Sequence, residues 1–117
     1  MDDKTLQMTL LFDFFGDILT EKQREYFDLY YNEDLSLSEI AENVGITRQG
    51  VRDIILRAEN ILVDTERKTG IVRRFEEMQA AISEAERYVR EIASKSDAPD
   101  IIILTDQISA ILQNLKG

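Results

Sequence analysis

The stretch that decides the fold is SLSEIAENVGITRQGVRDIIL, residues 36–56. Ser36 and Glu39 have the S-x-x-E spacing of a capping box, in which each side chain accepts a hydrogen bond from the backbone N–H of the other residue. This spacing predicts a helix over residues 37–43. Gly45 follows at the position where a left-handed residue commonly ends a helix. The stretch therefore begins with a short helix that has a defined start and a defined end.

A second helix is expected directly after this turn. Val51 and Ile54 lie on its inner side, and we expect Ile46 to point back into the core. Ala41 is small enough to let another helix cross the first one closely. An ordinary helical hairpin would not explain why Ala41 and Gly45 are both in register. The pattern therefore favours a helix-turn-helix motif.

Two further helices are predicted before the motif. The first, over residues 4–19, has a broad apolar face that we expect in the core: Leu6, Leu10, Leu11, Phe14, Phe15, Ile18 and Leu19. Thr20 and Gln23 repeat the capping pattern and start a second helix over residues 21–31. Its tyrosines could stack on nucleic-acid bases, but their helical placement favours packing at the edge of the core: Tyr26, Tyr30 and Tyr31.

The residues after the motif also predict helices. No Gly or Pro lies between Gly50 and Gly70, so the second motif helix should continue to about residue 68, with an apolar repeat at Val51, Ile54, Ala58, Ile61 and Thr65. Two more helices should follow Gly70, the second beginning at Pro99. Each has apolar residues spaced alternately three and four apart: positions 71, 75, 78, 82, 85, 89 and 92, then 101, 104, 108, 111 and 115.

These patterns predict an all-α protein of about six helices. We expect a helix-turn-helix domain over residues 1–69 and a C-terminal helical hairpin over residues 70–117. The apolar stripe of the last three helices is wider than one neighbouring helix needs. The hairpin should therefore close against the long motif helix or against a second copy, and we expect a homodimer.

The composition argues against most classes of enzyme. The chain has no Cys and no His, which removes thiolate nucleophiles, disulfides, imidazole bases and the usual zinc ligands. Its carboxylates surround no nucleophile, base or glycine-rich phosphate loop. We therefore predict a protein that is not an enzyme and that uses no metal, no cofactor and no small-molecule substrate.

The same composition bears on location. Asp13 and Asp17 interrupt the apolar N-terminal stretch, and residues 101–104 are too few to cross a bilayer. No basic segment precedes a long apolar one, as it would in a secretion signal. We expect a cytoplasmic protein without a membrane span.

The net charge of −9 hides a pattern. Residues 1–43 hold 3 basic and 11 acidic side chains, whereas residues 44–74 hold 7 basic and 4 acidic ones. Residues 75–117 are acidic again, with 4 basic and 8 acidic side chains. The one basic segment coincides with the second motif helix. Screening over roughly 8 Å at physiological salt lets such a segment act locally, although its acidic neighbour must weaken it.

In a helix-turn-helix motif, the N-terminal part of the second helix faces the groove of the nucleic acid. Arg48 lies in the first turn, where the helix dipole disfavours a cation, and repels Arg52 four residues on. Such costs favour an anionic partner over two merely solvated arginines. Asp53 is explained by a helix pair with Arg57. The candidate nucleic-acid-binding residues are Thr47, Arg48, Gln49, Arg52 and Arg57, of which Arg and Gln can pair with base edges.

Two other features are ambiguous. Gly50 costs up to about 1 kcal/mol in the first turn of a helix, which indicates a close approach by another helix or by a nucleic-acid backbone; we favour the backbone. Basic side chains near Gly70 could contact phosphates or could simply be solvated: Arg67, Lys68, Arg73 and Arg74.

The motif and the helix before it resemble region four of bacterial sigma factors, which reads a promoter element through this kind of motif. A likeness over nearly the whole chain is to the YlxM family of small bacterial helix-turn-helix proteins, carried by LLFDFFGDILTEKQREYFDLYYNEDLSLSEIAENVGITRQGVRDIILRAE. Genes of that family commonly adjoin the gene for the GTPase of the signal recognition particle. The resemblance therefore implies a role connected with protein targeting, and it carries over no catalytic residue.

Three functions follow as alternatives. The first is a regulatory protein that binds DNA or signal recognition particle RNA and works with the targeting machinery. The second is a sequence-specific transcription regulator, which would recognise a palindromic site. The third is a protein-interaction module whose acidic N-terminal face docks a basic partner such as the targeting GTPase.

Overall fold

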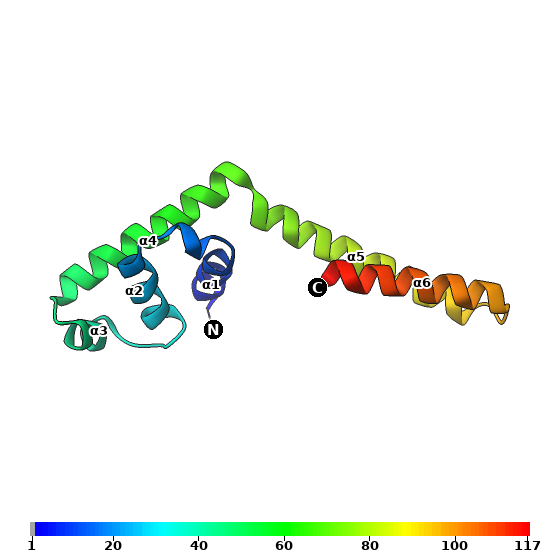
Figure 1. Ribbon diagram of the computed structural model, residues 1–117, viewed down its shortest axis with the longest axis horizontal. Helices are drawn as coiled ribbons and strands as arrows, with labels where there is room; N and C mark the ends of the chain where they lie inside the picture. Colours follow the sequence, from blue (N-terminus) through cyan, green and yellow to red (C-terminus); the bar gives the residue numbers. More distant parts are fainter. Residues whose placement is uncertain (1) are drawn as a thin grey trace. The chain divides into compact units, whose positions relative to one another are not determined.

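The computed structural model describes residues 2–117. Within them, helices are the only regular secondary structure (Figure 1). They are α1 (Asp3–Phe15), the short 3-10 helix η1 (Gly16–Ile18), α2 (Glu21–Tyr31), α3 (Leu37–Val44), α4 (Arg48–Thr69), α5 (Ile71–Ser94) and α6 (Pro99–Lys116). The all-α prediction with about six helices is confirmed. No helix in residues 2–117 is both long and apolar enough to cross a membrane.

The chain forms two compact units, the first ending at Val72 and the second spanning Arg73–Gly117. Unit 1 holds α1 to α4, and unit 2 holds α6 and nearly all of α5. The packing of unit 1 extends past Gly70, because Val72 is buried in its core. The Glu66 carboxylate of α4 holds the first residues of α5 in place, because it accepts a hydrogen bond from the Val72 backbone N–H at 2.9 Å.

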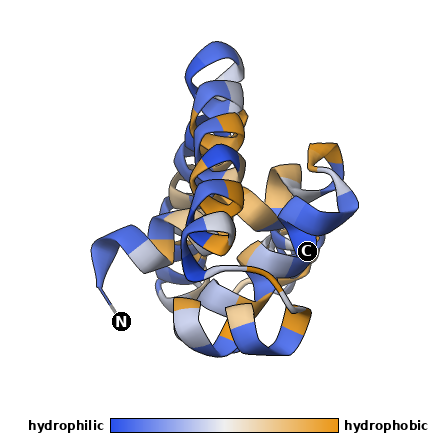
Figure 2. Cartoon of the chain, turned by 90° about the vertical axis from the view of Figure 1, so that its left-hand side faces the viewer, coloured by the Kyte–Doolittle hydropathy of each residue, from blue (hydrophilic) through white to orange (hydrophobic). Residues whose placement is uncertain are grey.

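Helix α4 is the centre of unit 1, because its inner stripe contacts both hydrophobic clusters. One cluster joins it to α1 and α2 around Phe27 and Leu62, and the other joins it to α2 and α3 around Ile40 and Val51. Each helix at the α3 end of the unit carries both hydrophobic and hydrophilic residues (Figure 2). The predicted stripe is partly wrong: the buried positions of α4 include Val51, Ile55, Ala58 and Leu62, whereas Ile54 and Ile61 are only half-buried.

The first predicted helix was wrong in two respects: where the helix ends and which of its residues are buried. The α-helix ends at Phe15, and Gly16, a weak helix former, begins η1 with the Phe12 ring against it. The buried residues of α1 are Met8, Leu11 and Phe15, with Leu19 buried beyond η1. Three residues expected in the core are exposed: Leu6, Phe14 and Ile18. The reason is that a single stripe of a 13-residue helix suffices to contact α2 and α4.

A polar cluster ties the N-terminal helices to α4. Glu59 is only 8% exposed, and its carboxylate accepts a 2.8 Å hydrogen bond from the Tyr31 hydroxyl. Lys4 lies 3.6 Å from the same carboxylate and compensates its charge. Tyr26 is buried and the Tyr30 ring stands edge-on to Tyr31, so the prediction that the tyrosines pack at the edge of the core is confirmed.

Tyr31 makes the stability of unit 1 sensitive to alkaline pH. Burial first, and then the hydrogen bond to Glu59, raises the pKa of Tyr31 well above its ordinary value of 10.0. In the unfolded state the Tyr31 hydroxyl has its ordinary, lower pKa and ionises first. The stabilisation of the folded state by neutral Tyr31 is therefore complete below about pH 10 and is lost as the pH rises further. We expect Tyr31→Phe to lose about 1–3 kcal/mol at neutral pH, since Glu59 loses a partner, and to decline less than wild type above pH 10. Urea denaturation across pH measures this; parallel declines would contradict it.

In unit 2, α6 runs back alongside α5 (Figure 1), and Lys116 of α6 reaches Glu86 of α5 at 2.9 Å. The predicted seam is partly wrong, because only Ile82 and Val89 among its residues are buried. The exposed seam residues include Met78, Ile92, Leu104, Ile108, Ile111 and Leu115. The stripe of α6 that is buried or half-buried combines two apolar residues with two small polar ones: Ile102, Thr105, Ser109 and Leu112. Two helices that have only each other can bury only one narrow stripe each.

Candidate nucleic-acid interface

Helices α3 and α4 each begin at a side chain that caps the helix by accepting a hydrogen bond from a backbone N–H group. Ser36 accepts from the Glu39 N–H at 3.1 Å, while the Glu39 carboxylate accepts from the Ser36 N–H at 3.0 Å, so the predicted capping box is confirmed. Gly45 ends α3 in the left-handed region with φ of 77°. Thr47 then caps α4 by accepting from the Gly50 N–H at 3.0 Å. Side-chain chemistry alone therefore fixes where α4 begins.

Ile46 departs from the expectation that it points into the core. It is 41% exposed, although its side chain lies close to Gly50 in the next turn. Packing between α3 and α4 is instead provided by Ile40 and Ala41 against Val51. A turn of three residues leaves Ile46 no room to reach that contact, so it covers the start of α4 from outside.

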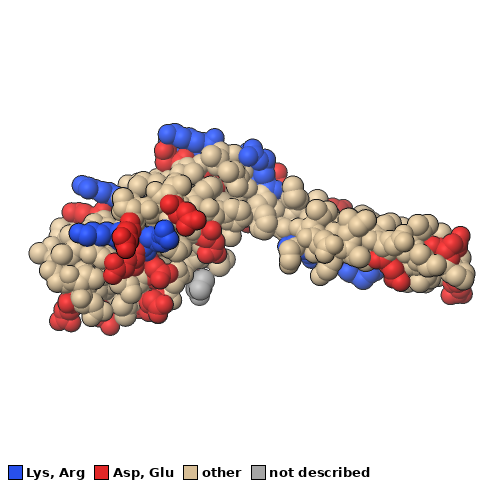
Figure 3. Space-filling model, viewed as in Figure 1, with Lys and Arg blue, Asp and Glu red and all other residues tan. Residues whose placement is uncertain are grey.

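Three arginines near the start of α4 are exposed. They are Arg48 and Arg52 in the first two turns and Arg57, which lies five residues after Arg52. Among residues 2–117, no carboxylate lies within ion-pair distance of any of these three. The first turn of α4 contains no acidic residue, so the positive end of the helix dipole adds to the arginine charges. The surrounding surface of unit 1 carries charges of both signs, with basic and acidic side chains interspersed (Figure 3).

Gln49 and Asp53 form a pair that was not predicted from the sequence. The Gln49 amide donates to the Asp53 carboxylate at 2.9 Å. The expected pair between Asp53 and Arg57 is therefore wrong, and Arg57 is left available. Gln49 would have to give up this exposed hydrogen bond to contact a base edge. Arg48 and Arg52 need no such rearrangement.

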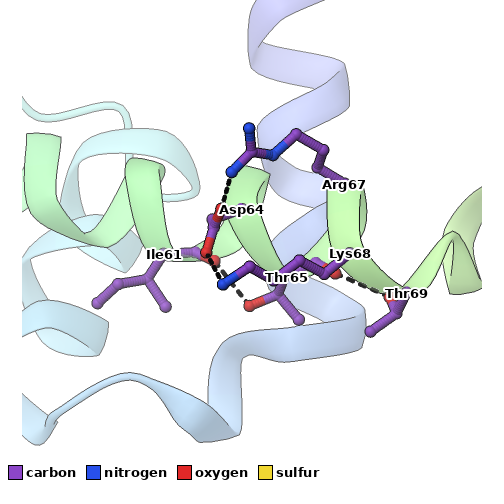
Figure 4. A network of polar contacts seen from close by, with 6 residues as sticks. All are labelled: Ile61, Asp64, Thr65, Arg67, Lys68 and Thr69. Atoms are coloured by element: carbon purple, nitrogen blue, oxygen red, sulfur yellow. Dashed lines mark hydrogen bonds and ion pairs between the residues drawn. The ribbon is translucent and has the colours of Figure 1, made fainter.

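The basic residues at the other end of α4 are engaged. Asp64 accepts hydrogen bonds from Arg67 and from Lys68, the latter at 3.0 Å (Figure 4). The two partners, Lys68 first and then Arg67, lower the pKa of Asp64. Nearby threonine hydroxyls donate to backbone carbonyls of the same helix (Figure 4). Arg67 and Lys68 thus have anionic partners of their own, which distinguishes them from Arg48 and Arg52.

Gly50 is crowded by its own turn. A Cβ placed on it would lie 3.1 Å from the Thr47 hydroxyl oxygen and 3.5 Å from Ile46 Cδ1. The nearest atoms belong to the preceding turn and not to another helix, which removes one of the two interpretations of this glycine. Approach by a nucleic-acid backbone stays a prediction.

We expect Gly50→Ala to leave the free energy of unfolding within about 1 kcal/mol of wild type, because the gain in helix propensity is offset by displacement of the Thr47 cap. Binding of nucleic acid should weaken, since the added methyl group occupies the surface beside Arg48. Thermal denaturation and a binding titration check the two parts. A variant that is more stable and binds as well as wild type would refute both.

Lys4 is one residue near this surface that the sequence analysis did not single out. It lines a recess of about 180 Å³ together with Tyr30, Arg52 and Glu59. Lys4 and Arg52 are 48 positions apart and give no local sequence signal, so only the packing of α1 against α4 brings them together. The recess is lined by basic and acidic side chains. Separately, no group of acidic side chains in residues 2–117 is arranged to hold a metal ion.

Comparison with known proteins supports the motif. A family model described as "Putative helix-turn-helix protein, YlxM / p13 like" (UPF0122) matches residues 2–98. A UPF0122 protein of Thermoanaerobacter sp. (strain X514) is 41% identical over 116 residues, covering 99% of each chain. One from Halalkalibacterium halodurans is 42% identical over 97 residues, covering 83% of this chain and 89% of its own. One from Caldanaerobacter subterraneus is 51% identical over 82 residues, covering 70% of each chain.

Proposed function

The chain belongs to the UPF0122 family of helix-turn-helix proteins, and from this membership we propose that it is a regulatory protein that binds nucleic acid through the first turns of α4. The observation that carries the proposal is the pair of exposed arginines, Arg48 and Arg52, at the positive end of a capped helix. Neither has a carboxylate partner within residues 2–117. Phosphates and the acceptor edges of guanine are the partners that such a group binds.

Each candidate residue has a separate role in this proposal. Arg48 and Arg52 contact phosphates or guanine edges, and Arg57, five residues after Arg52, adds a phosphate contact. Thr47 orients the start of α4 through its cap. Gln49 reads an adenine edge once it releases Asp53.

The resemblance to the YlxM family implies that the bound nucleic acid belongs to, or regulates, the signal recognition particle pathway. The candidates are signal recognition particle RNA and duplex DNA. We place the protein in the cytoplasm, where both occur. A transcription regulator is the version of this proposal in which a palindromic DNA site is bound in preference to any RNA.

Titration of the protein against duplex DNA and against signal recognition particle RNA, each at two salt concentrations, tests this function. Binding to one of them should weaken with rising salt, because each phosphate contact releases counterions. Preference for the RNA would support the targeting role, and preference for one palindromic duplex would support transcription regulation. Failure to bind either at low salt would refute the proposal.

A second candidate function rests on the exposed apolar residues of α1 and η1. Leu6, Phe14 and Ile18 are exposed on α1 and η1, beside the acidic Asp13 and Asp17. An apolar stripe with an acidic border suits a basic protein partner, such as the targeting GTPase. Binding of that GTPase by an Arg48→Ala/Arg52→Ala variant as tightly as by wild type would favour this function.

A further inference from the structure

Unit 2 exposes a continuous apolar face, which we call the hairpin face: Met78, Ile92, Leu104, Ile108, Ile111 and Leu115. The four residues of α6 are spaced four, three and four apart, so they lie on one stripe of that helix. Met78 and Ile92, two heptads apart, lie on one stripe of α5. Both stripes are adjacent to the one that faces the neighbouring helix. Because α5 and α6 run antiparallel, the two stripes lie on the same side of the hairpin.

The hairpin face carries no charge. The polar residues at its border on α6 are the neutral Gln107 and Asn114, and the only charged residues of α6 are Asp100, Asp106 and Lys116. Two charged residues lie at the ends of the face, Arg74 one turn before Met78 and Asp100 one turn before Leu104, whereas Arg87 and Arg90 lie on the other side of α5. Much of the hairpin surface in the view of Figure 3 is accordingly uncharged. Nucleic acid or a strongly charged protein would find no complementary group here.

Unit 2 has few buried residues for a segment of its length. Its buried residues among 73–117 are Ile82, Val89 and Thr105. Segments of about 40 residues usually need a metal, disulfides or oligomerisation to be stable, and the sequence provides no cysteine. The hairpin face therefore needs an apolar partner.

The exposed side chains of the hairpin face can form the apolar centre of a dimer interface. The six side chains are 43% to 61% exposed. They supply part of the roughly 800 Å² per partner that a standard interface buries, and its polar border supplies the rest.

We propose that the hairpin face binds the same face of a second copy, so that two α5–α6 hairpins form a four-helix bundle. A second copy is the one partner that is apolar, uncharged and equally short of packing, and a two-fold axis makes the face self-complementary. The hairpins of globular four-helix bundles bury their facing stripes in this manner. This inference does not depend on the nucleic-acid proposal, because it concerns only unit 2.

Sedimentation equilibrium of the full chain over a concentration series tests the proposal. Wild type should have twice the mass of a single chain, and Ile108→Glu/Ile111→Glu should weaken association at least tenfold. Ala110→Glu/Gln113→Glu adds the same charges on the other side of α6 and should remain dimeric. A monomeric wild type, or equal effects of the two double variants, would overturn the proposal.

A second measurement covers the case in which the glutamate variant fails to fold. The chain has no cysteine, so a single introduced thiol can be cross-linked only to another chain. Ile111→Cys should give a covalent dimer with a short bis-maleimide, and Gln113→Cys, two residues on, should not. Absence of the Ile111→Cys product from a folded, helical protein would overturn the proposal even if the wild type is dimeric.

Discussion

Replacing Arg48 and Arg52 together by alanine is expected to weaken nucleic-acid binding by about 10-fold or more for each arginine, since one such contact contributes about 1–3 kcal/mol. Both side chains are exposed at the capped start of α4, and no carboxylate in residues 2–117 is paired with them. If both contact phosphates, the plot of log binding constant against log salt should also become less steep by about 2. Fluorescence anisotropy at several salt concentrations measures both effects.

The matched control is Arg87→Ala/Arg90→Ala, which removes the same charge from α5 in unit 2. It should change binding several-fold less, because only the long-range field of the protein is altered. Arg67→Ala/Lys68→Ala is a second control on α4 itself, since both side chains are already bound to Asp64. If the three double variants weakened binding equally, net charge and not the helix-turn-helix would account for the affinity.

Replacing Phe27 by alanine is expected to destabilise unit 1 by about 3–5 kcal/mol, the usual cost of removing a buried ring. Phe27 has no exposed surface, and its ring lies 4.7 Å from that of Phe12 and 4.5 Å from that of Tyr31. It also packs in the cluster that holds Leu62 of α4. Because folded domains have only about 5–15 kcal/mol of stability, much of the total would be lost. Urea denaturation followed by circular dichroism measures the change.

Phe14→Ala makes the same chemical change at a site that is 37% exposed and should cost about 1 kcal/mol. A Phe27→Ala cost no larger than that of Phe14→Ala would show that the described core does not carry the stability of unit 1. Nucleic-acid binding by Phe27→Ala should persist below its lowered melting temperature, because α4 retains its caps.

Local chemistry determined where the motif helices begin and end. Ser36 with Glu39, Gly45 and Thr47 act within a few residues of themselves, so their hydrogen bonds could be predicted from spacing alone. The exposure of Arg48 and Arg52 follows in part from the same argument, because both lie in the first turns of a helix whose start is known. Their role in binding stays a prediction from that geometry and from the family.

Only the tertiary structure decided which apolar residues are buried. Helical spacing allows several overlapping stripes, and the choice depends on how many neighbours a helix has: α4 packs through Ile55 where Ile54 was expected, and α6 faces its partner through Thr105 and leaves Leu104 exposed. The partner of Asp53 and the closeness of Lys4 to Arg52 were likewise undecided by sequence. Caps depend on residues three positions apart, whereas burial depends on neighbours that only folding brings together.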